Sequence, residues 1–165
     1  MRVLVAYGSR RGGTAEIAQQ IGDVLAEAGL DVDVRPARRD LPVEGYDAVI
    51  VGGALYVNRW HPDARRFVAA NATALAQRPV WLFSSRPLDD EANREEIPPT
   101  RMVAALAERV RARGHVTFGG RLQPGAKGLL AGVIAKDHAG DWRDPERIAA
   151  WARRVAGELR GALTA

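Results

Sequence analysis

The sequence has 165 residues, 47% of them hydrophobic, which is enough for one folded domain around one core and argues against disorder. It contains no cysteine, which excludes disulfides, thiolate metal sites, iron–sulfur clusters and cysteine nucleophiles. The formal net charge is +4, but the arginines are spread over every predicted helix and alternate with Asp and Glu, a pattern that indicates a solvated surface rather than a nucleic-acid interface.

The first half of the chain alternates between apolar runs and helical periods. Residues 2–7 form a continuous apolar run, typical of a strand buried on both faces of a parallel sheet. A helical period begins at Thr14, and Gly29 is expected to end that helix. Its apolar face holds Ile17, Ile21, Val24, Leu25 and Ala28. Residues 30–36 alternate as in a half-exposed outer strand, and residues 46–54 predict a third, strongly apolar strand.

The second half continues this alternation. A helix is expected to open at Pro62, and a fourth strand over residues 79–83 runs into Ser84 and Ser85. The apolar residues of that helix are Phe67, Val68 and Leu75. Residues 86–99 are polar and predict a loop.

The last predicted elements carry clear boundary signals. Thr100 is expected to cap a helix that Gly114 ends, and residues 115–122 predict the fifth strand. The residues of that helix expected to face inward are Val103, Leu106 and Val110. Asp144 followed by Pro145 predicts the start of the final helix, with a capping residue before a proline at the first helical position. The apolar side of the final helix holds Ile148, Trp151, Ala152, Val155 and Leu159.

Strict alternation of strands and helices implies right-handed crossovers and a parallel sheet with helices on both faces. We therefore predict an α/β fold, a flavodoxin-like doubly wound three-layer sandwich with a five-stranded parallel sheet in the order 2-1-3-4-5, because a dinucleotide fold needs a sixth strand. No linker marks a second domain, so residues 1–165 are predicted to form a single domain. A ligand in such a fold lies beyond the carboxyl ends of the strands, which makes the loops after strands one, three and four the candidate site.

The glycine-rich turn after the first strand is the candidate anion site. Gly8, Gly12 and Gly13 allow the backbone N–H groups to approach an anion, and the helix that starts at Thr14 points its positive end the same way. Ser9 and Thr14 add hydroxyl groups. No Lys stands between Gly13 and Thr14, as the P-loop requires, and the dinucleotide fingerprint G-x-G-x-x-G is absent. The alternative is a turn that only connects strand and helix.

The loop after the third strand carries two large aromatic residues, Tyr56 and Trp60, which offer flat surfaces for a planar ring. Tyr56 is the better candidate for stacking. Trp60 has a second interpretation, packing on the following helix just before Pro62. We expect a capping or surface role for His61.

The loop after the fourth strand places Ser84 and Ser85 where hydroxyl and backbone groups can bind a polar ring edge. The acidic residues 89–91 lack the spacing of a metal site and are expected to be solvated. There is no G-x-S-x-G motif, and the histidines have no metal-binding spacing, so nothing indicates a hydrolase or a metal centre.

Four segments of the chain resemble the flavodoxin-domain proteins: residues 3–18, 46–52, 56–68 and 79–85. Within that superfamily they are most similar to the branch that includes the menaquinone-dependent protoporphyrinogen oxidases. The pair Asp141-Trp142 before the last helix is also similar to that branch. The resemblance covers nearly the whole chain.

The resemblance implies an FMN cofactor, with its phosphate on the first loop and its isoalloxazine ring beside Tyr56, between the loops at 53–60 and 84–88. The implied cofactor-binding residues are Ser9, Arg10, Arg11, Gly12, Gly13, Thr14, Ala54, Leu55, Tyr56, Asn58, Trp60, Ser84, Ser85, Arg86 and Pro87. No catalytic side chain is implied, because the cofactor itself carries the electron chemistry. A deazaflavin is the other phosphorylated cofactor that fits these residues.

Asn58 and Arg86 depart from the family pattern, since relatives tend to carry small residues at both positions. Arg86 either closes over the pyrimidine edge and stabilises an anionic reduced flavin, or obstructs the ring. Residues 123–141 look shorter and less aromatic than the insertion of the oxidases. The apolar run 129–134 between Lys127 and Lys136 is expected to pack on its own domain, or to dock weakly on a membrane surface.

Three functions therefore stay open. The leading hypothesis is an FMN-binding protein that acts in electron transfer or as a small flavin oxidoreductase. One alternative is a quinone-dependent protoporphyrinogen oxidase, and the other is a flavodoxin-like binding or regulatory module with weak or no flavin binding.

The charge of the chain limits its expected partners. Flavodoxins are typically acidic, whereas the isoelectric point here is about 10.1, so the redox partner or quinone-like acceptor is expected to be acidic or membrane-associated. The chain has no apolar run long enough to span a bilayer and does not start like a signal peptide. We expect a cytoplasmic monomer or homodimer.

Overall fold

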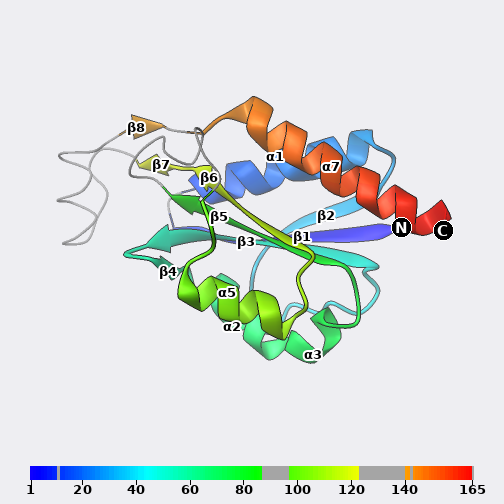
Figure 1. Ribbon diagram of the computed structural model, residues 1–165, viewed down its shortest axis with the longest axis horizontal. Coiled ribbons are helices and arrows are strands. Elements are labelled where there is room, and N and C mark those ends of the chain that lie inside the picture. Colours follow the sequence, from blue (N-terminus) through cyan, green and yellow to red (C-terminus); the bar gives the residue numbers. More distant parts are fainter. Residues whose placement is uncertain (11, 87–96, 123–139, 142, 165) are drawn as a thin grey trace.

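The computed structural model describes residues 1–10, 12–86, 97–122, 140–141 and 143–164. A parallel sheet runs through the middle of the molecule, with helices on both of its faces (Figure 1). The carboxyl ends of the central strands lie together at one edge of the sheet, and both chain termini lie toward the opposite edge (Figure 1). This three-layer arrangement confirms the predicted fold class.

The five predicted strands form the sheet in the predicted order. In chain order they are β1 (Arg2–Gly8), β2 (Asp31–Pro36), β3 (Ala48–Tyr56), β5 (Val80–Arg86) and β6 (Gly114–Gly119). Neighbouring strands pair in parallel in the order β2-β1-β3-β5-β6, which is the 2-1-3-4-5 order expected from the alternation of elements. A sixth, two-residue strand, β4 (Arg59–Trp60), was not predicted and pairs antiparallel with the end of β3.

Two apolar clusters hold the helices to the sheet. The helices are α1 (Gly13–Glu27) and α7 (Pro145–Thr164) on one face, and α2 (Pro62–Ala70), α3 (Ala72–Leu75) and α5 (Arg101–Arg109) on the other (Figure 1). On the first face Phe83, Phe118 and Trp151 form edge-on and tilted ring contacts, with centroids 5.8–6.4 Å apart. On the second face Trp60 and Phe67 pack with the aliphatic residues of β3 and β5. No helix in the described part of the chain is both long enough and apolar enough to cross a bilayer.

The predicted boundary signals of the first and last helices are confirmed. Gly29 adopts a φ of 91° and donates its N–H to the carbonyl of Ala26 at 2.9 Å, which closes the end of α1. The Asp144 carboxylate accepts hydrogen bonds from the N–H groups of Glu146 and Arg147, at 3.1 and 3.2 Å, and caps the start of α7.

Other predicted boundaries were wrong. Gly114 does not end a helix: α5 stops at Arg109, Arg111 adopts a φ of 55°, and Gly114 begins β6. The fifth strand ends at Gly119 and not at residue 122 as predicted. The chain continues into β7 (Arg121–Leu122), which pairs with β8 (Gly140–Asp141) as a separate antiparallel ladder. The expected loop starts later than residue 86, since β5 continues through Ser84 and Ser85 to Arg86.

A tight hairpin joins β3 to β4. Its two turn residues, Val57 and Asn58, both have a positive φ, 50° and 60°, as a two-residue type I′ turn requires. Asn tolerates this conformation, but a β-branched residue does so only with strain. Val57 is also 66% exposed, so packing does not compensate for that strain.

Replacing Val57 should therefore stabilise the protein. We expect Val57→Asn to raise the free energy of unfolding by about 1 kcal/mol, because Asn adopts a positive φ at lower cost. Denaturant unfolding measures this change. Val57→Thr is the matched control, since it keeps the β-branch and should give no gain; an equal gain in both variants would contradict the strain argument.

A buried polar pair connects β5 and β6. Ser84 Oγ lies 2.9 Å from His115 Nε2, on the face of the sheet that α5 covers, whereas His115 Nδ1 is buried with no hydrogen-bond partner in the described part of the chain. Burial lowers the pKa of His115 to about 4. The imidazole is therefore neutral in the folded protein at pH 6, where it begins to take up protons in the unfolded chain.

This pair predicts a loss of stability in acid. Because the folded pKa lies below the unfolded value, the stabilisation is present above about pH 6.5 and is lost as the pH falls toward 4, by roughly 2–3 kcal/mol in total. His115→Gln should flatten the dependence of the unfolding free energy on pH in this window. Ser84→Ala should leave the slope intact, because it retains the buried ring. A His115→Gln variant with the slope of the native protein would rule out this explanation.

Candidate functional site

A cavity of about 260 Å³ lies at the carboxyl edge of the sheet, between the first turns of α1 and α2. The predicted site residues that line it are Ser9, Arg10, Gly13, Thr14, Ala54, Leu55, Tyr56, Trp60 and Ser85. Arg59, His61, Pro62 and Arg65 complete the lining. The structure thus brings together residues from the loops after β1 and β3 and from the end of β5.

The start of α1 presents unpaired backbone N–H groups. Gly12 holds the capping position with a φ of 85°, and no described side chain caps the helix there. The first bond of the helix runs from the N–H of Glu16 to the carbonyl of Gly12, at 3.0 Å, which leaves the preceding N–H groups without intrahelical partners. Ser9 Oγ accepts a hydrogen bond from the Gly12 N–H at 3.0 Å and shapes the turn. This geometry suits an anion at the positive end of the helix.

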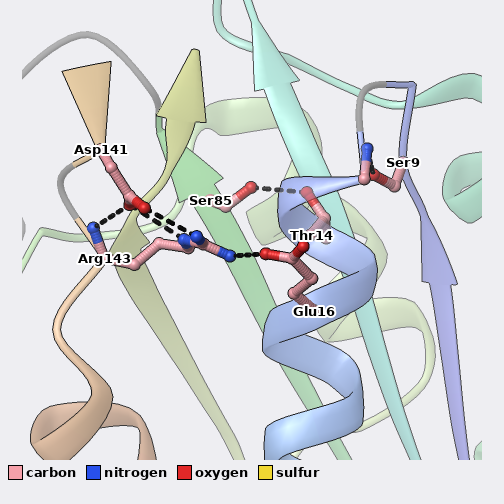
Figure 2. A network of polar contacts seen from close by, with 7 residues as sticks. Ser9, Thr14, Glu16, Ser85, Asp141 and Arg143 are labelled. Atoms are coloured by element: carbon pink, nitrogen blue, oxygen red, sulfur yellow. Dashed lines mark hydrogen bonds and ion pairs between the residues drawn. The ribbon is translucent and has the colours of Figure 1, made fainter. Parts of the chain in front are cut away.

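The Thr14 hydroxyl makes a contact that its expected role did not include. Thr14 Oγ1 and Ser85 Oγ lie 2.7 Å apart, and both residues are 3% exposed, so the pair joins the first turn of α1 to the end of β5 (Figure 2). Ser84, the preceding residue of β5, points to the opposite face and contacts His115 instead. Ser85 therefore lines the cavity and Ser84 does not.

Tyr56 and Trp60 form the wall on the side of β3. The guanidinium of Arg10 lies 6.0 Å from the centre of the Tyr56 ring. Trp60 is 1% exposed and packs in the core above α2, against Gly53, where a Cβ would come within 2.6 Å of its ring. Trp60 thus packs beside α2, as its second interpretation expects, and also lines the cavity, while its contact with a planar ring stays a prediction.

Two donors in this wall have no protein partner. Tyr56 Oη and Trp60 Nε1 are buried and form no hydrogen bond in the described structure. Buried polar groups are normally paired, and leaving one unpaired costs about 1–3 kcal/mol. A ligand with hydrogen-bond acceptors in the cavity removes that cost.

The cavity is positively charged. Among the described residues, its lining includes the guanidinium groups of Arg10, Arg59 and Arg65 and no acidic side chain. His61 Nδ1 accepts a hydrogen bond from the N–H of Asp63 at 3.1 Å, which confirms its expected capping role. Burial and the nearby Arg10 charge lower the pKa of His61, and the Asp63 carboxylate opposes them. With Nδ1 as an acceptor, the neutral ring carries its proton on Nε2.

Sequence reasoning missed Arg59 and Arg65. Arg65 lies in the first turn of the helix that opens at Pro62, and such a turn faces the carboxyl edge of a parallel sheet. Its position in that first turn is the sequence signal from which Arg65 could have been predicted to line the site. Arg59 lies in β4, a strand that the sequence analysis did not predict.

The remaining predicted residues lie outside the cavity or outside the described residues. Asn58 and Arg86 line a second, adjoining hollow of about 790 Å³, which shares Leu55 and Arg59 with the cavity. Gly12 supports the turn at the start of α1 and does not line the cavity. Arg11 and Pro87 lie outside the described residues, as do residues 89–91 and the run 129–134.

An ion network beside the cavity joins the start of α7 to α1. Arg143 donates to both carboxylate oxygens of Asp141, at 2.9 and 2.7 Å, and pairs with Glu16 in the first turn of α1 (Figure 2). The hydrogen bonds to Asp141 raise the pKa of Arg143, so its charge is secure. Arg143 thus pairs at once with Asp141 and with Glu16, the acidic residue in the first turn of α1.

The described residues contain no cluster of three or more His, Asp or Glu side chains that would suit a metal ion. The chemistry of the cavity is instead that of an anion site beside two aromatic rings. Backbone N–H groups and arginines could bind an anion there, and Tyr56 and Trp60 add aromatic rings and two donors that have no partner among the described residues.

Some known proteins are similar to this chain in sequence, and others are similar to it in fold. The protoporphyrinogen IX dehydrogenase (quinone) of Escherichia coli strain K12 is 31% identical over 86 residues, which are 51% of this chain and 48% of that protein, so the match spans about half of the relative. Rubredoxin oxygen:oxidoreductase from Desulfovibrio gigas superposes with a TM-score of 0.69 at 15% identity, over 99% of this chain and 37% of that one. Oxidised flavodoxin 2 from Bacillus cereus superposes with a TM-score of 0.63 at 16% identity, over 97% of this chain and 99% of that one.

The two solved structures establish the common fold. The family profile of the flavodoxin domain matches residues 4–130, which include β1, the turn at Gly12, the β3–β4 hairpin and β5. Because this match covers most of the sequence, the chain belongs to the flavodoxin domain family.

Proposed function

We propose that this chain binds FMN at the carboxyl edge of its sheet and acts in electron transfer or as a small flavin oxidoreductase. The observation that carries the proposal is the convergence, on one cavity, of the uncapped start of α1 with Arg10 and Arg65, with no acidic side chain among the described residues that line it. A phosphate monoester, with about two negative charges at neutral pH, is the ligand that this donor set suits.

The residues of the chain divide into two groups in this proposal. The amides at the start of α1, together with Ser9, Arg10 and Arg65, bind the phosphate. Tyr56 and Trp60 contact the body of the cofactor, and their two unpaired donors fit its oxygen and nitrogen acceptors. When bound, the flavin supplies the redox chemistry, and the protein supplies binding, orientation and charge.

The positive charge at this edge also bears on the partner. A protein or quinone-like molecule that exchanges electrons here must approach a surface that carries Arg10, Arg59 and Arg65. We propose that this partner is acidic, because complementary charge speeds encounter and sets orientation.

A quinone-dependent protoporphyrinogen oxidase is the second candidate function. It is favoured by the likeness to the Escherichia coli protein of that name, which reaches 31% identity over about half of either chain. Anaerobic oxidation of protoporphyrinogen by the FMN-loaded protein, with a quinone as acceptor, separates this activity from electron carriage. A protein that binds FMN and leaves protoporphyrinogen unchanged is a carrier or acts on another substrate.

The binding proposal predicts a difference between FMN and riboflavin. Arg65→Gln should weaken FMN binding roughly ten-fold or more, because it removes a charged donor from the phosphate. Riboflavin has the same ring and no phosphate, so the variant should bind it as the native protein does. Fluorescence quenching of each flavin on titration measures both affinities.

The neighbouring Arg66 provides the matched control. It lies on the same helix, one residue further along, is exposed and does not line the cavity. Arg66→Gln should leave both affinities unchanged. If native protein bound neither flavin, the chain would be a flavodoxin-like binding or regulatory module; if Arg65→Gln weakened both flavins equally, the phosphate would lie elsewhere.

A further inference from the structure

A second hollow lies beside the β3–β4 hairpin, outside the cofactor cavity. It has a volume of about 790 Å³ and lies between the tip of the hairpin and the first turns of α5. We call it the hairpin groove and define it by Leu55, Val57, Arg59, Ile97, Arg101 and Met102. Its size falls in the range of pockets that bind small organic molecules.

The walls of the hairpin groove are largely apolar. Val57 comes from the turn of the hairpin, Ile97 from the segment before α5, and Met102 from the first turn of α5. Val57 is 66% exposed and is the one large hydrophobic side chain that the described surface leaves so open. Since an isolated exposed Val needs no explanation, the relevant point is its place on the wall of a hollow with other apolar groups.

The charge in the groove has one sign. Arg59 projects from β4 and Arg101 from the start of α5, Arg86 reaches it from the end of β5, and no acidic residue is among the described residues that line it. A concave surface that carries charges of one sign concentrates the field and attracts ligands of the opposite sign. Arginine also binds planar carboxylate and sulfonate groups through two parallel hydrogen bonds.

One polar atom in the groove lacks a partner. Thr100 stands at the capping position of α5, yet its hydroxyl does not cap the helix, and Thr100 Oγ1 is buried without a hydrogen bond to any described residue. Thr100 also lines the groove, between the segment that holds Ile97 and the guanidinium of Arg101. An acceptor atom of a ligand at this point would satisfy a group that the protein leaves unpaired.

We propose that the hairpin groove is a binding site for an anionic, largely apolar small molecule. Arg59 and Arg101 hold the anionic group, and Val57, Ile97 and Met102 contact the apolar body. The groove shares Leu55 and Arg59 with the cofactor cavity, so its ligand lies next to the cofactor. Only the ligand's role as a reaction partner rests on the proposed flavin function; its binding does not.

A matched pair of ligands tests the charge requirement. 2-Naphthoate and 2-naphthamide have the same ring system and nearly the same shape, but only the first is charged. Titration of each into the ¹⁵N-labelled full chain, followed by amide chemical shifts, gives both the affinity and the location. We expect naphthoate to bind roughly ten-fold more tightly than the amide, as one charged hydrogen-bonding pair contributes. Shifts should centre on residues 55–59 and 97–105 rather than on residues 8–14.

Two arginines of α5 give the matched variants. Arg101 lies in the first turn and lines the groove, whereas Arg109 lies in the last turn and does not. Arg101→Gln should reduce the preference for naphthoate over naphthamide, because Arg59 alone then holds the anionic group, and Arg109→Gln should leave the preference unchanged. Removing a positive charge destabilises a helix at its last turn, where Arg109 lies, but not at its first turn, where Arg101 lies. A change of ligand preference in Arg101→Gln alone therefore cannot be explained by unfolding.

The remaining outcomes decide against the proposal. Equal affinity for the two ligands, unchanged preference in Arg101→Gln, shifts confined to residues 8–14, or no binding of naphthoate would each overturn it. The last result would favour an acidic protein segment as the occupant of the groove. FMN affinity is measured on the same samples. Binding of naphthoate without binding of FMN would support the groove proposal and contradict the proposed cofactor. Binding of FMN without binding of naphthoate would support the cofactor and contradict the groove proposal.

Discussion

The left-handed turn at Gly12 controls what the edge of this sheet can bind. With a φ of 85°, Gly12 starts α1 with no capping side chain among the described residues, so the first N–H groups of the helix lack intrahelical partners at the edge of the cavity that Gly13 and Thr14 line. A side chain with a Cβ adopts this conformation only at a cost. This turn therefore sets where α1 begins at the edge of the cavity.

The surrounding contacts fit that arrangement. The hydrogen bond between Thr14 and Ser85 ties the start of α1 to β5, so the helix cannot tilt away from the sheet without breaking a buried pair. Arg143 pairs with Glu16 and with Asp141 and so connects the first turn of α1 to the segment before α7. The anion site is thus held by polar contacts from three segments that lie far apart in the sequence (Figure 2).

Sequence patterns predicted the sheet order because each buried strand is a continuous apolar run and each helix carries a periodic apolar face. The caps at Gly29 and Asp144 were predicted as well, because capping signals are also local to the sequence. The failures lie where a non-local contact decides. The end of the fifth strand at Gly119 depends on pairing between β7 and β8, which are far apart in sequence. The hairpin turn at Val57 and Asn58 was not predicted, because a β-branched residue such as Val57 rarely adopts a positive φ and so gives no signal of a turn.

The candidate site likewise contains features that the sequence predicted and features that it did not. The glycine-rich turn was predictable from its residues, and its spacing excludes the P-loop and the dinucleotide fingerprint. The partners of its side chains were not: Ser84 and Ser85 are adjacent, yet one pairs with His115 and the other with Thr14, because successive residues of a strand face opposite sides. Arg65 and Arg59 reach the cavity from elements whose orientation only the fold defines. The positive charge that the composition spreads over the whole chain is, at this edge, gathered around two adjoining hollows.

The central claim is that the amides at the start of α1, with the arginines around them, bind the phosphate of a flavin. The ³¹P resonance of FMN in the presence of excess protein tests it most directly, because the chemical shift reports the protonation of the phosphate. Free FMN takes up a proton near pH 6, where phosphate monoesters have their second pKa. The account predicts a shift that stays at its dianionic value from about pH 8 down to about pH 5, since donors and positive charge stabilise the dianion. A bound phosphate that titrates as it does in free FMN would contradict the account.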